Sequence, residues 1–469
     1  MLAGCRKDQK EKMMKKKAPV VKNQEFEATV IDLTYDGNGV VKFDDFPIFV
    51  TNAVPGEKII VGVTKVTTNY GFGRVVKRLV ESADRNADID AKVLQSGVAP
   101  LAHLTYEAQL KHKQKQVADV FNKQHVAVNV APTVGMDDPW GYRNKAQIPV
   151  REINGELTTG FYRRGSHRLQ PMEDFYIQDP EIDKAIVVIR DILRKYHVAA
   201  YDEQNHKGVV RTIMVRRGHY SHEMMIVLVT RAKRLPTSEF IINDIREALP
   251  EVVSIIQNVN QEKTNVIMGD QNKVLWGEKA IKDTLLGKTF AIGPNSFYQV
   301  NPAMTEVLYQ TAADKADLKP TDVVIDAYSG IGTISLTIAD RVESVLGVEI
   351  VPEAVDDAKR NADLNGIKNA KFALGKAEEK MSQWAAEGLK PDVIFLDPPR
   401  KGLTQELVDA AVEMGPQKVV YISCNPATLA RDAALFVEQG YEVTGDVQPI
   451  DQFPQTTHVE SVTVLERKA

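Results

Sequence analysis

Apolar runs alternate with amphipathic stretches along the last third of the chain, from about residue 321 onward. Continuous apolar segments such as 323–325 and 393–396 fit strands that are buried on both faces, and the amphipathic stretches between them fit helices. This alternation predicts a doubly wound, Rossmann-like sheet covered by helices. Ligands of such sheets bind outside the carboxyl ends of the strands, so the polar residues at those ends are the candidate site residues.

A different pattern occupies residues 23–80, where short alternating runs are separated by turn signals. Residues 36–39 read Asp-Gly-Asn-Gly, and a Pro-Gly pair stands at 55–56. The spacing predicts five short strands in an OB-like β-barrel, a fold that often binds single-stranded nucleic acid. The preceding residues 1–22 are rich in Lys and Arg and poor in large apolar residues, which predicts a basic, disordered leader.

Residues 81–290 mix helix and strand patterns and predict a central α+β domain, which leaves 291–469 for the doubly wound domain. Aromatic and cationic side chains interleave in FYRRGSHR at 161–168, and further arginines follow at 211, 216 and 217. Rings that stack on bases and cations that hold phosphates indicate RNA binding. Hairpins with solvated arginines would give the same pattern at either patch alone. The expected fold class is therefore multidomain α/β.

Charge is distributed unevenly between the two halves of the chain. Residues 291–469 hold 16 Lys and Arg against 27 Asp and Glu, whereas residues 1–290 hold 43 against 36. A basic first part joined to an acidic second part fits a polyanion-binding region followed by a separate chemical region. Solvated surface charge would explain the asymmetry equally well.

The chain has two cysteines, Cys5 and Cys424, which excludes a disulfide framework and favours a cytoplasmic location. Cys5 lies in LAGC, a sequence like a lipoprotein cleavage box, but only Met1 precedes that box and no apolar signal segment does. No apolar run approaches the roughly 20 residues that cross a membrane. We therefore expect no membrane association.

The first predicted strand of the doubly wound domain ends in a glycine-rich turn, DAYSGIG at 326–332. Such a turn lets a ligand approach the backbone at a helix N-terminus. Glu349 ends the second strand, 19 residues beyond Gly330, a spacing at which an acidic residue accepts hydrogen bonds from ribose hydroxyls. Ser335 replaces the third glycine of a dinucleotide fingerprint, so an adenosine cofactor without a pyrophosphate fits better than NAD. An NAD-dependent dehydrogenase is disfavoured for this reason and because no hydride-transfer partner is evident.

Two further strand ends carry reactive groups. Asp397 is followed by two prolines, which stiffen the loop and leave its carboxylate at the mouth of the site. Cys424 ends the fifth strand, immediately before Asn425 and Pro426. A cysteine in the middle of a strand is usually inert and buried, but one at the carboxyl end is placed to act as a nucleophile.

Four motifs together resemble the RNA (uracil-5-)-methyltransferase family. They are SCNPATLARD at 423–432, FLDPPRKGL at 395–403, FYQVN at 297–301 and HVESV at 458–462. They follow the family's order, and the N-terminal barrel resembles a TRAM domain, so the resemblance covers nearly the whole chain.

The resemblance implies that Cys424 is the nucleophile and Glu460 the proton acceptor in the formation of 5-methyluridine. A thiolate adds to C6 of uracil so that C5 can attack the methyl group, and a base then removes the C5 proton. Cys424 would benefit from a pKa below the ~8.5 of a free thiol. The target uridine must leave its stack, so we expect a flipped-out base.

The resemblance also implies a cofactor, S-adenosylmethionine, with S-adenosylhomocysteine as the product. The family's cofactor contacts correspond to Gln299, Tyr328, Glu349 and Asp397, and Gly330 is expected to line the same turn.

Many members of the family carry a four-cysteine iron–sulfur cluster. The matching positions here fall near Asp90, Ser96, Ala99 and Phe175, and none is cysteine. Four thiolates hold such a cluster, so we predict no iron–sulfur cluster and no other metal site.

Cluster-free, TRAM-bearing members resemble the Gram-positive enzymes that modify two uridines in 23S rRNA. We therefore expect 23S rRNA as substrate, at two sites. One alternative is methylation of the tRNA T-loop. The other is a non-catalytic RNA-binding or ribosome assembly factor, which would not require the intact nucleophile, base and cofactor motifs. No long coiled coil or exposed apolar stripe is evident, so we expect a monomer.

Overall fold

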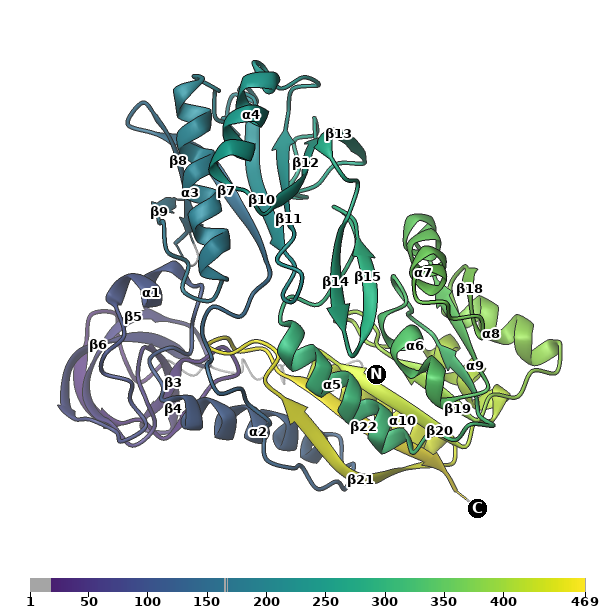
Figure 1. The fold of residues 1–469 in the computed structure, drawn as a ribbon. Coiled ribbons are helices and arrows are strands. Elements are labelled where there is room, and N and C mark those ends of the chain that lie inside the picture. The colour runs from purple at the N-terminus through teal and green to yellow at the C-terminus, as the bar shows by residue number, and fades with distance from the viewer. Residues whose placement is uncertain (1–17, 164–165, 167, 469) are drawn as a thin grey trace, which may run out of the picture. The chain divides into compact units, whose positions relative to one another are not determined.

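The computed structural model describes residues 18–163, 166 and 168–468. Most of the expected basic leader, residues 1–17, lies outside the described residues. The chain divides into two compact units, each described by itself below: residues up to 89 with 100–108, and residues 90–99 with 109 onward (Figure 1). No described helix is both long and apolar enough to cross a membrane.

The first unit is one strongly curved sheet around a small apolar core (Figure 1). Six strands form it in the order β1-β5-β6-β4-β3-β2, one more than the sequence predicted, because the short β2 pairs with the start of β3. Val20, which the sequence analysis assigned to the leader, is buried in this core. The strands are β1 Glu25–Thr29, β2 Asp32–Leu33, β3 Gly39–Phe43, β4 Phe46–Thr51, β5 Lys58–Val66 and β6 Gly71–Val80.

A seven-stranded sheet forms the centre of the second unit, in the order β13-β12-β11-β10-β7-β8-β9. Buried apolar residues on alternate positions of β7 and β10 pack with helices α3 and α4 on one face, and Met214 and Met225 on the other face join the C-terminal core. The strands are β7 Lys145–Ile153, β8 Glu156–Tyr162, β9 Leu169–Pro171, β10 Val210–Arg217, β11 Met224–Thr230, β12 Val252–Val259 and β13 Gln271–Gly277. The helices are α1 Ala91–Ser96, α2 Tyr106–Lys123, α3 Pro180–Lys195 and α4 Ser238–Ala248.

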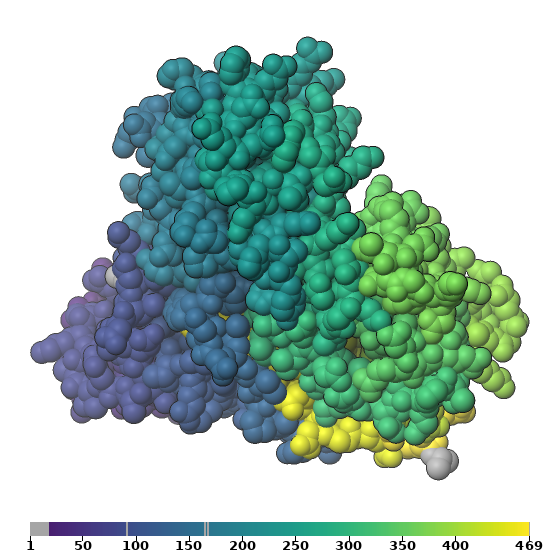
Figure 2. Space-filling view, viewed as in Figure 1, coloured from purple at the N-terminus to yellow at the C-terminus, as the bar shows by residue number. Residues whose placement is uncertain are grey.

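A hairpin of β14 (Ile281–Leu285) and β15 (Lys288–Ile292) joins the central sheet to the C-terminal sheet (Figure 1). Residues 293–301, which follow the hairpin, lead into helix α5. In Figure 2 the central region (teal) and the C-terminal region (green) form two lobes of the second unit.

The C-terminal sheet has the order β18-β17-β16-β19-β20-β22-β21, with β22 antiparallel to both of its neighbours and the other pairs parallel. The chain leaves β16 toward one edge and returns to its other side at β19, so the topological switch point lies between β16 and β19. Ligands of doubly wound sheets bind at such a point. The strands are β16 Val323–Asp326, β17 Ser344–Glu349, β18 Ala370–Leu374, β19 Val393–Leu396, β20 Lys418–Ser423, β21 Tyr441–Ile450 and β22 Glu460–Arg467. The helices are α5 Pro302–Ala316, α6 Thr333–Ile338, the 3-10 turn Ala339–Arg341, α7 Pro352–Leu364, α8 Ala377–Ala386, α9 Gln405–Met414 and α10 Pro426–Glu438.

Candidate active site

Cys424 and Glu460 are brought together by the antiparallel pairing of β20 and β22. Ser423, the last residue of β20, pairs with Ser461, so Cys424 directly follows the paired end of β20 and Glu460 directly precedes its partner in β22. The Glu460 carboxylate is close enough to act on the pKa of Cys424. Asp397, just after β19, is close enough to both to act on their pKa values. Three of the residues predicted from sequence therefore meet at the carboxyl ends of β19 and β20.

The Cys424 thiol is half-buried, and its surroundings oppose ionisation. Burial, followed by the nearby carboxylates of Glu460 and Asp397, raises the pKa of Cys424 to about 11, and Arg400 opposes the rise. This direction is opposite to the lowered pKa that would favour a nucleophile. The thiol of the isolated chain is instead protonated at neutral pH, so its ionisation needs either a proton acceptor or an added positive charge.

The two carboxyl groups beside the thiol are also shifted. Burial raises the pKa of Glu460 to about 8, with Asp397 adding to the rise and Arg400 opposing it. Burial, followed by the charge of Asp326, raises the pKa of Asp397 to about 7. Carboxyl groups with pKa values near neutrality suit proton transfer at physiological pH, because such a group can both accept and release a proton.

The glycine-rich turn after β16 is held by two carboxylates. Glu349 accepts hydrogen bonds from the backbone N–H of Gly330 at 3.1 Å and of Val351 at 2.8 Å. Asp326 accepts from the Ser335 hydroxyl at 2.6 Å and from its N–H at 3.1 Å. Ser335, which distinguishes this turn from a dinucleotide fingerprint, therefore anchors the start of α6.

Gly330 adopts a left-handed conformation with φ of 52°, and a Cβ built there would meet no atom within 4 Å. Open space beside the half-buried backbone of Gly330 fits the adenosine cofactor that the sequence predicted. Tyr328 is half-buried at the same turn, where burial, followed by Glu378, raises its pKa.

Gln299 lies in the segment between β15 and α5 and is buried, at 8% exposure. Its carbonyl oxygen accepts a hydrogen bond from the Asn144 side chain at 3.4 Å. Asn301, two residues later, caps α5 and donates to the Gln452 carbonyl at 3.1 Å. Gln299 is thus fixed between the central sheet and the segment that leads into Glu460.

Asn425 and Pro426, which follow Cys424, both have roles at the start of helix α10. Its side-chain oxygen caps α10 by accepting from the Ala427 N–H, and its side-chain nitrogen donates to the Arg400 carbonyl at 2.8 Å. Pro426 takes the first helical position, where its missing N–H costs nothing. This one side chain therefore joins the loop of Asp397 to the loop of Cys424.

Arg400 belongs to the site although the sequence analysis gave it no role. It lowers the pKa values of both Cys424 and Glu460, and its guanidinium lies 3.4 Å from His458 Nε2. The sequence signal for this role was its position directly after Asp-Pro-Pro, because a loop that presents one site residue tends to present its neighbours too.

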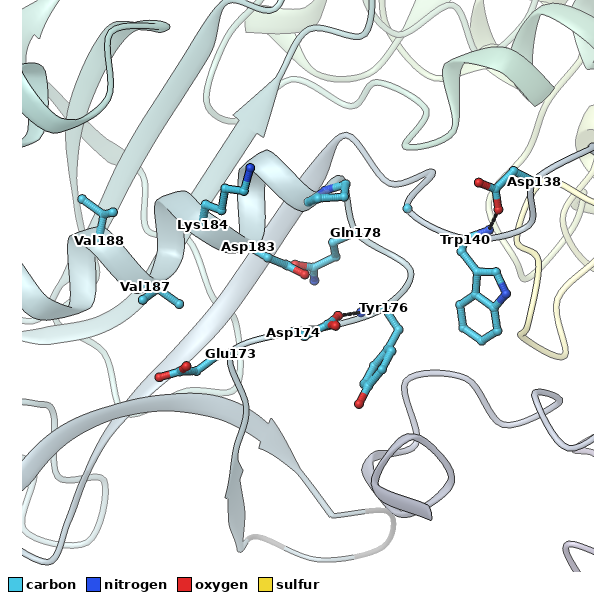
Figure 3. Close-up of a pocket in the computed structure, with 12 residues that line it drawn as sticks. Asp138, Trp140, Glu173, Asp174, Tyr176, Gln178, Asp183, Lys184, Val187 and Val188 are labelled. Carbon is cyan, nitrogen blue, oxygen red and sulfur yellow. Dashed lines mark hydrogen bonds between the residues drawn. The ribbon is translucent and has the colours of Figure 1, made fainter. Parts of the chain in front are cut away.

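A separate cavity of about 890 Å³ lies beside helix α3 and contains none of the predicted site residues (Figure 3). Its wall includes four carboxylates and the rings of Trp140 and Tyr176. An acidic wall disfavours an RNA phosphate, so this cavity is not a candidate for the transfer site.

The positions that match the cluster cysteines of the family have other contacts here. Asp90 caps α1, Ser96 donates to the Val93 carbonyl at 2.7 Å, and Phe175 is buried in the central core. Among the residues that the structure describes, no group of three or more His, Cys, Asp or Glu is arranged to hold a metal ion.

Comparison with known proteins shows the family to which the chain belongs. A family model described as tRNA (Uracil-5-)-methyltransferase matches residues 105–468, and the TRAM domain model matches residues 19–76. Relatives named "Uncharacterized RNA methyltransferase" are 59% identical in Lactiplantibacillus plantarum, over 97% of this chain and 100% of that protein, and 52% identical in Enterococcus faecalis, over 96% and 99%.

One solved structure is similar over most of its length. It is the Pyrococcus abyssi tRNA (uracil-54, C5)-methyltransferase in complex with S-adenosyl-L-homocysteine, with a TM-score of 0.75 and 26% identity, covering 93% of this chain and 99% of that one. The expected multidomain α/β fold and the expected TRAM domain are confirmed. The chain belongs to the tRNA (uracil-5-)-methyltransferase family.

Proposed function

We propose that this protein transfers a methyl group from S-adenosylmethionine to C5 of a uridine in 23S rRNA, through a covalent adduct between Cys424 and C6 of the base. The observation that carries the proposal is that Cys424 and Glu460 lie close together at the ends of the paired strands β20 and β22, with Asp397 near enough to act on the pKa of both. A nucleophile and a base that lie close together can act on adjacent carbons of one flat ring.

The residues of the glycine turn fit the cofactor. Gly330 leaves open space, Glu349 holds the turn, and Asp397 is near enough to Asp326 at the start of the turn for their charges to interact. When bound, S-adenosylmethionine supplies an electrophilic methyl group and a positive charge, and leaves as S-adenosylhomocysteine. A positive charge held near Asp397 would offset one of the carboxylates that oppose ionisation of Cys424, and would therefore lower the pKa of the thiol.

Cys424 and Glu460 divide the remaining chemistry between them. The Cys424 thiolate forms a bond to C6, and the electrons of the C5–C6 double bond move toward O4 as an enolate. C5 then bonds to the methyl carbon. Glu460 removes the proton from C5, the double bond re-forms, and the C6–S bond breaks to return the Cys424 thiolate. Burial of Glu460 raises its pKa to about 8, which makes it a stronger proton acceptor than an exposed carboxylate.

The TRAM domain and the absence of cysteine at the cluster positions support 23S rRNA, at two sites, as the substrate. A second candidate is the tRNA T-loop. It is favoured by the Pyrococcus abyssi enzyme, which is named for uracil-54 of tRNA and matches 93% of this chain.

The two substrates are separated by one experiment. The protein is incubated with labelled S-adenosylmethionine and unmodified 23S rRNA or unmodified tRNA, and the label is mapped by nuclease digestion. We expect label at C5 of two 23S uridines and none with Cys424→Ala. Label in tRNA alone would keep the chemistry and replace the substrate. No label in either RNA, with RNA binding intact in the Cys424→Ala variant, would favour an RNA-binding factor.

A further inference from the structure

Two cations face each other at one end of the central sheet. Lys145 on β7 is the direct partner of Arg216 on β10 in the antiparallel pair. Side chains opposite each other project from one face, and like charges there repel. Ala146 and Val215, the neighbours of Lys145 and Arg216 along their strands, point to the other face, into the core that includes α3. Lys145 and Arg216 therefore lie on the face that is turned away from α3.

That face adjoins the segment that carries Gln299. Arg216 is 1% exposed and donates to the carbonyl oxygens of Gly293 at 2.8 Å and Ser296 at 2.9 Å. Asn144, next to Lys145, donates from its N–H to the Val300 carbonyl at 2.8 Å. The cationic corner is therefore hydrogen-bonded to the segment that carries Gln299. Arg143, two residues before Lys145, is also close enough to lower the pKa of His458, whose Nε2 lies 3.4 Å from the Arg400 guanidinium.

Lys145 has no counter-ion in the part of the chain that the structure describes. The residue is half-buried, and no described residue forms a hydrogen bond or ion pair with its amine. Burial, followed by the charges of Arg216 and Arg143, lowers the pKa of Lys145 to about 7. Arg216 is hydrogen-bonded to carbonyl groups and not to a carboxylate, so it leaves the positive charge uncompensated. A half-buried cation beside two others costs stability, which is typical of a site that binds an anion.

We propose that Lys145, with Arg143, binds a phosphate of the substrate RNA next to the uridine that enters the Cys424 site. The inference rests on the proposed function, because it takes RNA as the ligand. Phosphates carry the negative charge of RNA, and contacts to them fix its register while a single base is extruded. The carboxylate of the cofactor shares this anionic chemistry, so the test measures cofactor affinity separately.

The test compares Lys145→Met with Lys145→Arg, which keeps the charge, and with Lys371→Met. Lys371 is exposed near the amino end of β18, away from the ligand edge of its sheet. RNA affinity is measured by fluorescence anisotropy at several salt concentrations, with the 23S fragment and the tRNA T-arm as probes. Lys145→Met should bind RNA about tenfold more weakly, and the slope of log K against log salt should fall by about 0.7 to 0.9 for one lost phosphate contact. Lys145→Arg and Lys371→Met should bind like the wild type, and affinity for S-adenosylhomocysteine should not change.

The denaturant midpoint of Lys145→Met distinguishes a phosphate-binding role of Lys145 from a structural role. Removal of an unpaired charge opposite Arg216 should leave the denaturant midpoint unchanged or raised, whereas loss of a stabilising contact would lower it. A neutral methylphosphonate at one position flanking the target uridine should weaken the binding of RNA to the wild type. The same replacement should not further weaken the binding of RNA to Lys145→Met.

An unchanged salt slope in Lys145→Met would overturn the phosphate contact. So would a loss of S-adenosylhomocysteine affinity with RNA affinity intact, which would reassign the cation to the cofactor. Methyl transfer is followed in the same samples. Binding that depends on Lys145 without any transfer by the wild type would contradict the proposed function and leave the phosphate contact standing.

Discussion

Lys113 on α2 and Asp451, the residue after β21, form an ion pair in which both side chains are completely buried. The Lys113 amine also donates to the Phe453 carbonyl at 3.0 Å, and the Asp451 N–H donates to the Val134 carbonyl at 2.8 Å. The pair fixes the start of the segment 451–459, which leads directly to Glu460. A contact between residues 338 positions apart therefore sets where the proposed base begins its strand.

Lys113→Met should destabilise the protein strongly, because it leaves the Asp451 carboxylate buried without a partner. A loss of about 3–5 kcal/mol in the free energy of unfolding is expected from denaturant titration. The control is Lys115→Met, which breaks the exposed pair with Asp119 on the same helix and should cost less than about 1 kcal/mol. Equal effects of the two variants would contradict the assigned role of the buried pair.

Gly330→Ala should weaken cofactor binding beyond its cost in stability. Gly366 is a matched control, since it is also left-handed, with φ of 66° against 52°, and a Cβ at either position meets no atom within 4 Å. Both substitutions should cost about 1 kcal/mol of stability from backbone strain. Only Gly330→Ala should raise the Kd for S-adenosylhomocysteine, by about tenfold or more, as measured by calorimetry. A normal Kd in that variant would remove Gly330 from the cofactor site.

Tyr421→Phe tests the contact between β20, the strand that ends just before Cys424, and helix α10. The Tyr421 hydroxyl donates to the buried Asp432 carboxylate at 2.7 Å, and the same carboxylate accepts from the Leu403 N–H at 2.8 Å. Loss of a hydrogen bond to a charged group should cost about 1.5–3 kcal/mol in thermal or denaturant unfolding. An unchanged midpoint would show that Asp432 finds its partners without Tyr421.

Glu460→Gln should change the pH dependence of stability. Burial, together with Asp397, raises the pKa of Glu460 from an ordinary value near 4.5 to about 8, so the folded state binds this proton more tightly than the unfolded state. Stability from this group is then present below pH 4.5 and is lost as the pH rises toward 8. Relative to the wild type, Glu460→Gln should gain stability over that window, on the order of 4 kcal/mol at pH 8. A constant difference between pH 4 and pH 9 would contradict the raised pKa.

Much of the site could be predicted from local sequence. Cys424, Glu349 and Asp397 each come at the end of an apolar run, and parallel strands end at one edge, so the position of all three along the carboxyl edge of the sheet follows from the pattern. The partner of Cys424 could not be read in the same way. Glu460 begins a strand that runs antiparallel to the rest, and only the family motif pointed to it.

Other features depend on pairings that no local pattern contains. The opposition of Lys145 and Arg216 requires the register of β7 with β10, across 71 positions of sequence. The high pKa of Cys424 arises first from burial and then from Glu460 and Asp397, which lie 36 and 27 positions away. The sequence suggested a reactive thiol and could not show that its carboxylate neighbours oppose its ionisation.

The central claim is tested most directly by trapping the covalent adduct. RNA in which the target uridine carries fluorine at C5 cannot lose a C5 proton, so an adduct methylated at C5 stays attached to the nucleophile. With S-adenosylmethionine present, the wild type should give a protein–RNA species that survives denaturing electrophoresis, and peptide mapping should assign the bond to Cys424. Cys424→Ala should give none, and Glu460→Gln should trap even the ordinary uridine RNA. A stable adduct on another residue, or methylation of ordinary RNA by Cys424→Ala, would contradict the account.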